Sequence, residues 1–113
     1  MTALTRHNEA VFEDECRELM AAADQLEGLA ARTTGGDWRV GGLLASRPEV
    51  IAEWPGGAVE HVAEARANTA DWITTLSPAV AEPMAAWLRS AAEAAPITPP
   101  ALAFARALTS RRR

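Results

Sequence analysis

The residues that come closest to a metal-binding pattern are His61 and Glu64, which lie three positions apart in EHVAE at 60–64. On a helix, that spacing places a histidine and a carboxylate on one face, as in the carboxylate-bridged metal sites of helical bundles. Such sites need a second matching pair, and the other histidine, His7, has no acidic partner at that spacing. The sequence therefore predicts a surface histidine flanked by acids, and no metal or other cofactor.

Cys16 is the second candidate for chemistry, because a thiol whose pKa is lowered by its surroundings acts as a nucleophile. It falls on an apolar stripe with Phe12 and Leu19, which predicts a buried structural thiol instead. The few serines occur in expected caps and loops, so no Ser-His-Asp arrangement is recognisable. Pairs of glycines match neither a phosphate-binding loop nor a dinucleotide-binding motif; they are Gly35-Gly36, Gly41-Gly42 and Gly56-Gly57. We therefore expect a protein that is not an enzyme.

Charge and composition narrow the classes of partner. The chain has 113 residues, enough for one domain over 1–113, and a net charge of −4. Three positive charges are the C-terminal Arg111, Arg112 and Arg113, and removing them from −4 leaves −7 for the rest. Because duplex-DNA binders usually present a basic face, this balance argues against broad contact with phosphates. Residues 109–113 are expected to form a frayed basic tail.

Cysteine usage and hydropathy predict the compartment. A single cysteine excludes an internal disulfide and is typical of a reducing environment. No apolar run approaches the roughly 20 residues of a membrane-spanning helix, and MTALTRHNEA at the N-terminus lacks the apolar core of a signal peptide. We expect a cytoplasmic protein of a bacterial cell, with no membrane association.

The first element expected is a long helix over residues 6–32. Its apolar residues recur at steps of four and three, which is an amphipathic helical spacing; they are Phe12, Cys16, Leu19, Ala23, Leu26 and Ala30. The same spacing is that of a coiled coil, so homodimerisation through this helix is an alternative. Because the stripe covers fewer than three heptads, packing within the same chain is the preferred interpretation.

Residues 38–54 are expected to form a β-hairpin with strands 38–44 and 48–54. In the predicted register Trp38 faces Trp54 and, on the other side of the sheet, Arg39 faces Glu53. Such an opposite-charge cross-strand pair contributes about 0.2–1 kcal/mol. One register thus accounts for the alternation, the aromatic pair and the ion pair.

Helices are expected to make up the rest of an α+β fold with four or five helices. The first covers 58–67, and a new start follows near Asn68 and Thr69. Ser77-Pro78 opens a helix to about residue 95, in which Pro83 predicts a kink or a 3₁₀ first turn. Thr98-Pro99 repeats the cap-plus-proline signal and opens a last helix.

Any partner-binding surface must be sought among side chains that the core does not require. If exposed, Trp38 and Trp54 form a binding hot spot, since tryptophan is enriched in such sites; Arg39, on the other face of the expected hairpin, is a further candidate. The remaining candidates are acids on the outer face of the expected 58–67 helix and the basic tail; they are Glu60, Glu64, Arg111, Arg112 and Arg113.

Several segments together resemble small actinobacterial and actinophage proteins of unknown function, of the Ead/Ea22-like type. They are GDWRV at 36–40, VIAEW at 50–54, AVEHVAEA at 58–65, LSPAVAEPMAAWL at 76–88 and ALAFARAL at 101–108. The resemblance implies a phage or prophage accessory protein and brings no active-site residues. We therefore expect a non-catalytic protein that binds a host or phage macromolecule. Inhibition of a host system is one such role. A nucleic-acid-binding regulator that uses a helix and the Arg tail is the alternative.

Overall fold

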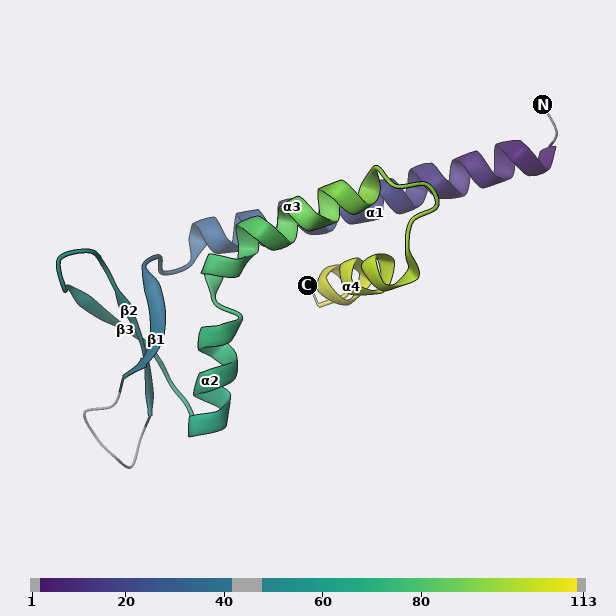
Figure 1. The fold of residues 1–113 in the computed structure, drawn as a ribbon. Coiled ribbons are helices and arrows are strands. Elements are labelled where there is room, and N and C mark those ends of the chain that lie inside the picture. Colours follow the sequence, from purple (N-terminus) through teal and green to yellow (C-terminus); the bar gives the residue numbers. More distant parts are fainter. Residues whose placement is uncertain (1–2, 42–47, 112–113) are drawn as a thin grey trace. The chain divides into compact units, whose positions relative to one another are not determined.

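The computed structural model describes residues 3–41 and 48–111, and it is an α+β protein in which helix predominates (Figure 1). In chain order the elements are α1 (Ala3–Arg32), β1 (Asp37–Gly41), β2 (Glu49–Glu53), β3 (Val59–Glu64), α2 (Ala67–Thr75), the 3₁₀ helix η1 (Pro78–Val80), α3 (Ala81–Ala92) and α4 (Pro99–Thr109). The predicted class is confirmed, whereas the bounds of the helices and the form of the hairpin differ in detail.

Contacts between residues divide the chain into two compact units. The helical unit comprises the described residues of Met1–Leu29 and Glu82–Arg113, and the sheet unit is Ala30–Ala81. Each unit has its own buried side chains, and each is described separately below.

The helical unit is built on the apolar stripe of α1. Leu19 and Ala23 are completely buried, and Phe12, Cys16 and Leu26 pack around them. The core is completed from α3, α4 and the segment between them by Ala85, Leu88, Ala92, Ile97, Ala101, Leu102 and Ala105. The stripe that the sequence marks as a possible dimer seam is therefore used inside its own unit.

Proline positions define where the C-terminal helices begin. Pro78 opens η1, and α3 follows directly at Ala81. Pro83 lies in the first turn of α3, where a missing backbone N–H removes no intrahelical hydrogen bond. The predicted 3₁₀ first turn is thus present. Thr98 precedes α4 at the cap position, although its side chain makes no capping hydrogen bond.

The hairpin is present, but its predicted register is wrong by two residues. Trp38 pairs with Ala52 rather than Trp54, and Arg39 lies opposite Ile51 rather than Glu53. Because side chains alternate with a period of two, a shift of two keeps every residue on its predicted face of the sheet. Arg39 and Glu53 are diagonal neighbours on one face, and their side chains still form the expected ion pair.

Residues 59–64 form a third strand, so the predicted helix over 58–67 is wrong. The sheet order is β1-β2-β3, with both pairs antiparallel. Gly56 and Gly57 have φ of 99° and 93°, and the N–H of Trp54 donates to the carbonyl oxygen of Ala58 at 2.9 Å. Proline followed by glycine at positive φ is the signature of a tight turn, which folds the chain back as a hairpin.

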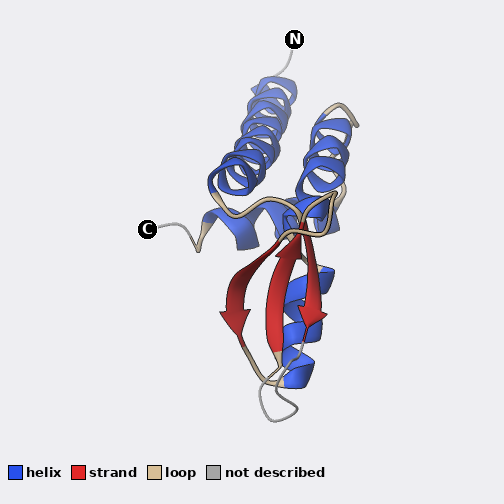
Figure 2. Ribbon diagram, turned by 90° about the vertical axis from the view of Figure 1, so that its left-hand side faces the viewer, coloured by secondary structure: helices blue, strands red, loops and turns tan. Residues whose placement is uncertain are grey.

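Helix α2 packs against β1 and β2 and buries one face of the sheet (Figure 2). Val50 and Ala52 of β2 and Ala70 of α2 are completely inaccessible to solvent. The small side chain of Ala70 lets the helix backbone approach the strands. The helix starts at Ala67, just before the caps expected from the sequence.

Candidate interaction surface

The tryptophans selected from the sequence, Trp38 and Trp54, pack against the segment that connects α1 to β1. Both are half-buried. Nε1 of Trp38 donates to the carbonyl oxygen of Thr34 at 3.0 Å. The indole of Trp54 lies against Gly35 and Gly36, so closely that a Cβ on Gly36 would fall 2.9 Å from its ring. These contacts assign both rings a structural part in the sheet unit.

The most exposed tryptophan is Trp72, which the sequence analysis did not select. Its exposed fraction is 67%, and that of Leu76, one turn later in the chain, is 49%. Ala70 is buried and Ile73 is half-buried, whereas Trp72 in α2 and Leu76, the residue that ends the helix, are both exposed. The four-residue spacing of Trp72 and Leu76 was the sequence signal for this exposed pair. It did not identify the pair because apolar residues occur on both faces of this short helix.

Trp87 of α3 is also partly exposed, at 47%, but it has a packing partner in the helical unit. Its ring lies 5.5 Å from that of Phe104, centroid to centroid, at an interplanar angle of 52°. Tilted aromatic pairs of this kind contribute to stability beyond the area they bury. Trp87 therefore has an aromatic packing partner, whereas among the described residues Trp72 takes part in no such ring pair.

The face of the sheet opposite α2 is polar and carries cross-strand pairs. Arg39 of β1 is bonded to Glu53 of β2, and Nδ1 of His61 in β3 is hydrogen-bonded to the Glu49 carboxylate of β2. A bulge in β3 follows His61, so Glu64 comes to lie opposite Glu49. His61 and Glu64 thus share a face, as expected, but on a strand rather than a helix. Within residues 3–41 and 48–111, no group of three or more His, Cys, Asp or Glu side chains is arranged to hold a metal ion.

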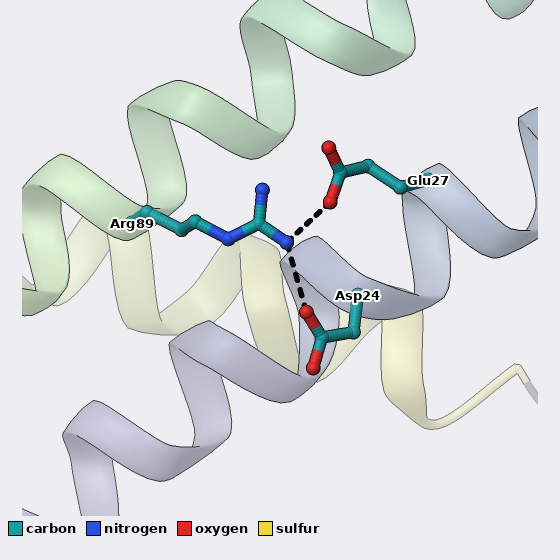
Figure 3. A network of polar contacts seen from close by, with 3 residues as sticks. All are labelled: Asp24, Glu27 and Arg89. Carbon is teal, nitrogen blue, oxygen red and sulfur yellow. Dashed lines mark hydrogen bonds and ion pairs between the residues drawn. The ribbon is translucent and has the colours of Figure 1, made fainter.

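Two other arginines link the helices of the helical unit. Figure 3 shows Arg89 of α3 between Asp24 and Glu27 of α1; the contact with Asp24 measures 2.8 Å. Hydrogen bonds to Glu27 and Asp24 raise the pKa of Arg89, and the Arg89 hydrogen bond lowers the pKa of Glu27. Arg106 of α4 makes a bidentate contact with Glu18 at 3.0 Å, and this hydrogen bonding raises its pKa. Both guanidinium groups are therefore engaged by carboxylates.

The remaining predicted candidates lie at the ends of elements or on the sheet edge. Glu60 and Glu64 are exposed on β3. Arg111 is exposed just after α4, where its N–H donates to the carbonyl oxygen of Leu108 at 3.3 Å. Arg112 and Arg113 lie outside the described residues.

Cys16 is half-buried rather than fully buried as predicted, and it packs beside the helical core. Its Sγ lies 3.0 Å from the carbonyl oxygen of Ala92, where the S–H donates to the end of α3. In the residues that the structure describes, no helix has the length and apolar character needed to cross a membrane.

No protein-family model, curated protein or solved structure matches this chain.

Proposed function

We propose that this chain is a small non-catalytic protein that acts by binding another protein, and that Trp72 and Leu76 form the centre of the contact. The observation that carries the proposal is the exposure of these two bulky apolar side chains, one in α2 and the other at the end of that helix four residues later. Tryptophan buried at an interface is a frequent source of binding energy, whereas its exposure to water gains the fold nothing. The role of a phage or prophage accessory protein rests on the resemblance of its sequence segments.

The alternative, a nucleic-acid-binding regulator, has less support. It predicts a contiguous arginine face formed by Arg66, Arg89, Arg106 and the C-terminal tail. Arg89 is paired with Asp24 and Glu27, and Arg106 is paired with Glu18. Phosphate binding at either position would have to displace carboxylates that already neutralise the guanidinium groups.

A capture experiment with matched variants tests the proposal. Wild-type protein, Trp72→Ala and Trp87→Phe are immobilised and exposed to lysate of the bacterial host at low and high salt. Trp87→Phe removes a partly exposed indole but keeps an aromatic ring against Phe104. We expect one lysate protein to be retained by the wild type and by Trp87→Phe but not by Trp72→Ala. After purification, that protein should bind the wild-type chain directly.

The apolar nature of the contact also predicts its salt dependence. A contact made mainly by Trp72 and Leu76 should persist at high salt, because screening weakens charge pairs and not apolar contacts. Retention of the same proteins by all three forms, or of none by the wild type, contradicts the proposal.

A further inference from the structure

The outer side of β3 is an open strand edge. Because Trp54 donates to the carbonyl oxygen of Ala58, the backbone of Ala58 points toward β2. Antiparallel pairs alternate between bonded and non-bonded positions, so Glu60 also points toward β2, whereas Val59 and His61 point away from it. Within the described residues, no strand pairs with that outer side. The N–H and C=O groups of Val59 and His61 are therefore placed to receive another extended chain.

Helix α2 does not close this edge. Its main contacts are with β1 and β2, the opposite edge strand and the central strand of the sheet. Side chains along the first half of β3 are exposed, and Val59 reaches 58%. An added strand would thus meet apolar surface at Val59 as well as open backbone groups.

The charge of the sheet indicates what kind of strand fits. The three strands contain one arginine, Arg39, and five carboxylates, which are Asp37, Glu49, Glu53, Glu60 and Glu64. Arg39 is bonded to Glu53. Across the described residues, the Glu60 carboxylate has no hydrogen-bond or ion-pair partner. An incoming strand places a side chain beside Glu60 on the same face, and a cation is favoured there.

We propose that the β3 edge binds an extended peptide segment that alternates basic and apolar residues, by addition of a fourth strand to the sheet. Main-chain hydrogen bonds to Val59 and His61 supply the register. A lysine or arginine of the partner lies next to Glu60, and an apolar residue on the other face lies next to Val59. This is the recognition mode in which the backbone provides affinity and alternate side chains provide specificity.

Glu60, Glu64 and the bulge in β3 also determine which strands cannot pair with this edge. Charged residues and bulges on an edge hinder pairing with unsuitable strands. A second copy of β3 would bring Glu60 and Glu64 of one chain toward the same acids of the other, and like charges at such positions destabilise pairing. The bulge lies after His61 and leaves Val59–His61 regular. The edge therefore selects a basic strand and disfavours self-association.

The test uses the full chain, labelled with ¹⁵N, and an acetylated, amidated hexapeptide that alternates valine and arginine. We expect the amides of Val59 and His61 to shift on titration and to exchange more slowly with solvent. Glu60→Gln should weaken binding about two- to five-fold, the range of an exposed ion pair. Val59→Pro should abolish binding, because it removes an outward N–H at the first residue of the strand, whereas Val59→Thr keeps that donor and should bind.

Two control peptides separate strand addition from simple attraction of charge. A peptide N-methylated at alternate nitrogens keeps the arginines but loses donors, and a peptide with glutamate in place of arginine keeps the donors. Neither should bind. Equal binding of the N-methylated peptide, shifts that map to α2 instead of β3, or no shift at roughly 1 mM peptide overturns the proposal.

This proposal does not depend on the role of Trp72. Trp72→Ala should leave the affinity for the hexapeptide unchanged, since Trp72 lies on the side of α2 that faces away from the sheet. Loss of hexapeptide binding in Trp72→Ala, with Val59→Pro unaffected, would contradict the assignment to β3 and leave the proposed contact at Trp72 standing.

Discussion

Replacing Gly36 by alanine should destabilise the sheet unit by about 0.5–3 kcal/mol. Gly36 has a φ of 78°, a left-handed conformation that costs an alanine about 1–2 kcal/mol. A Cβ there would lie 2.9 Å from the Trp54 ring and 3.1 Å from the carbonyl oxygen of Glu53. Moving the indole off its rotamer adds about 0.5–1.5 kcal/mol, and the stiffer unfolded chain offsets about 0.4–1 kcal/mol.

Gly35 is the matched control for this prediction. Its φ is outside the left-handed region, and a Cβ there would meet the Trp54 ring at 3.6 Å, an ordinary van der Waals distance. Gly35→Ala should therefore be neutral or stabilise the protein by up to about 1 kcal/mol. The two variants add the same methyl group at neighbouring positions, so the difference between them isolates the conformation and the contact of Gly36.

Urea unfolding followed by tryptophan fluorescence measures the difference. In a Trp87→Phe background the three remaining tryptophans, Trp38, Trp54 and Trp72, all lie in the sheet unit, so the signal reports that unit. With a slope of about 1–3 kcal/mol per molar urea, the midpoint of Gly36→Ala should fall by roughly 1 M. Equal midpoints for Gly35→Ala and Gly36→Ala would contradict the left-handed conformation of Gly36 and its close contact with Trp54.

Further predictions concern the core and the ion pairs. Leu88→Ala should cost about 2–5 kcal/mol in thermal or urea unfolding, because Leu88 is completely buried in the helical unit; a smaller loss would contradict that packing. The Arg89 hydrogen bond lowers the pKa of Glu27 below its ordinary value of 4.5, so the stability it supplies is complete above that pH and is lost as pH falls through the folded-state pKa. Glu27→Gln should flatten this acidic part of a melting-temperature profile, and an unchanged profile would refute the assignment. A double-mutant cycle on Arg39 and Glu53 should give a coupling of about 0.2–1 kcal/mol that falls with added salt; a coupling of zero would show that the pair does not contribute.

The helical unit was largely predictable from the sequence, because its signals are local and repeated. The stripe from Phe12 to Leu26 fits one helical period over four turns, and it does pack in the core. Pro78 and Pro99 mark starts of helical segments at positions where proline has little cost. Long periodic segments with caps leave few alternative structures.

The register of the hairpin was not predictable from the same kind of argument. An ion pair between Arg39 and Glu53 forms whether the two residues are directly opposite or diagonal. The pair therefore does not distinguish the predicted register from the observed one. In the observed register Trp54 contacts Gly35 and Gly36. These two residues lie outside the strands, so a comparison of the strand sequences does not reveal the contact.

Strand β3 was misassigned because its six residues are too few to define a period. Val59, Val62 and Ala63 fit the i, i+3, i+4 spacing of a helix, and a strand with a bulge accommodates the same residues. The preceding Pro55-Gly56-Gly57 is a turn signal between two strands as much as the end of one. Pairing with β2 decided between the two, and pairing is a tertiary effect.

The exposure of Trp72 follows from the geometry of the sheet that α2 covers. The sheet face beneath α2 is already occupied by Val50, and the helix meets it through Ala70. A tryptophan in place of Ala70 would hold the helix away from the strands, so the large apolar residues are directed outward. The fold of the sheet unit thus accounts for a small residue at position 70 and does not account for a large one at position 72. This surface tryptophan, which packing does not require, is therefore the residue on which the proposed binding function rests.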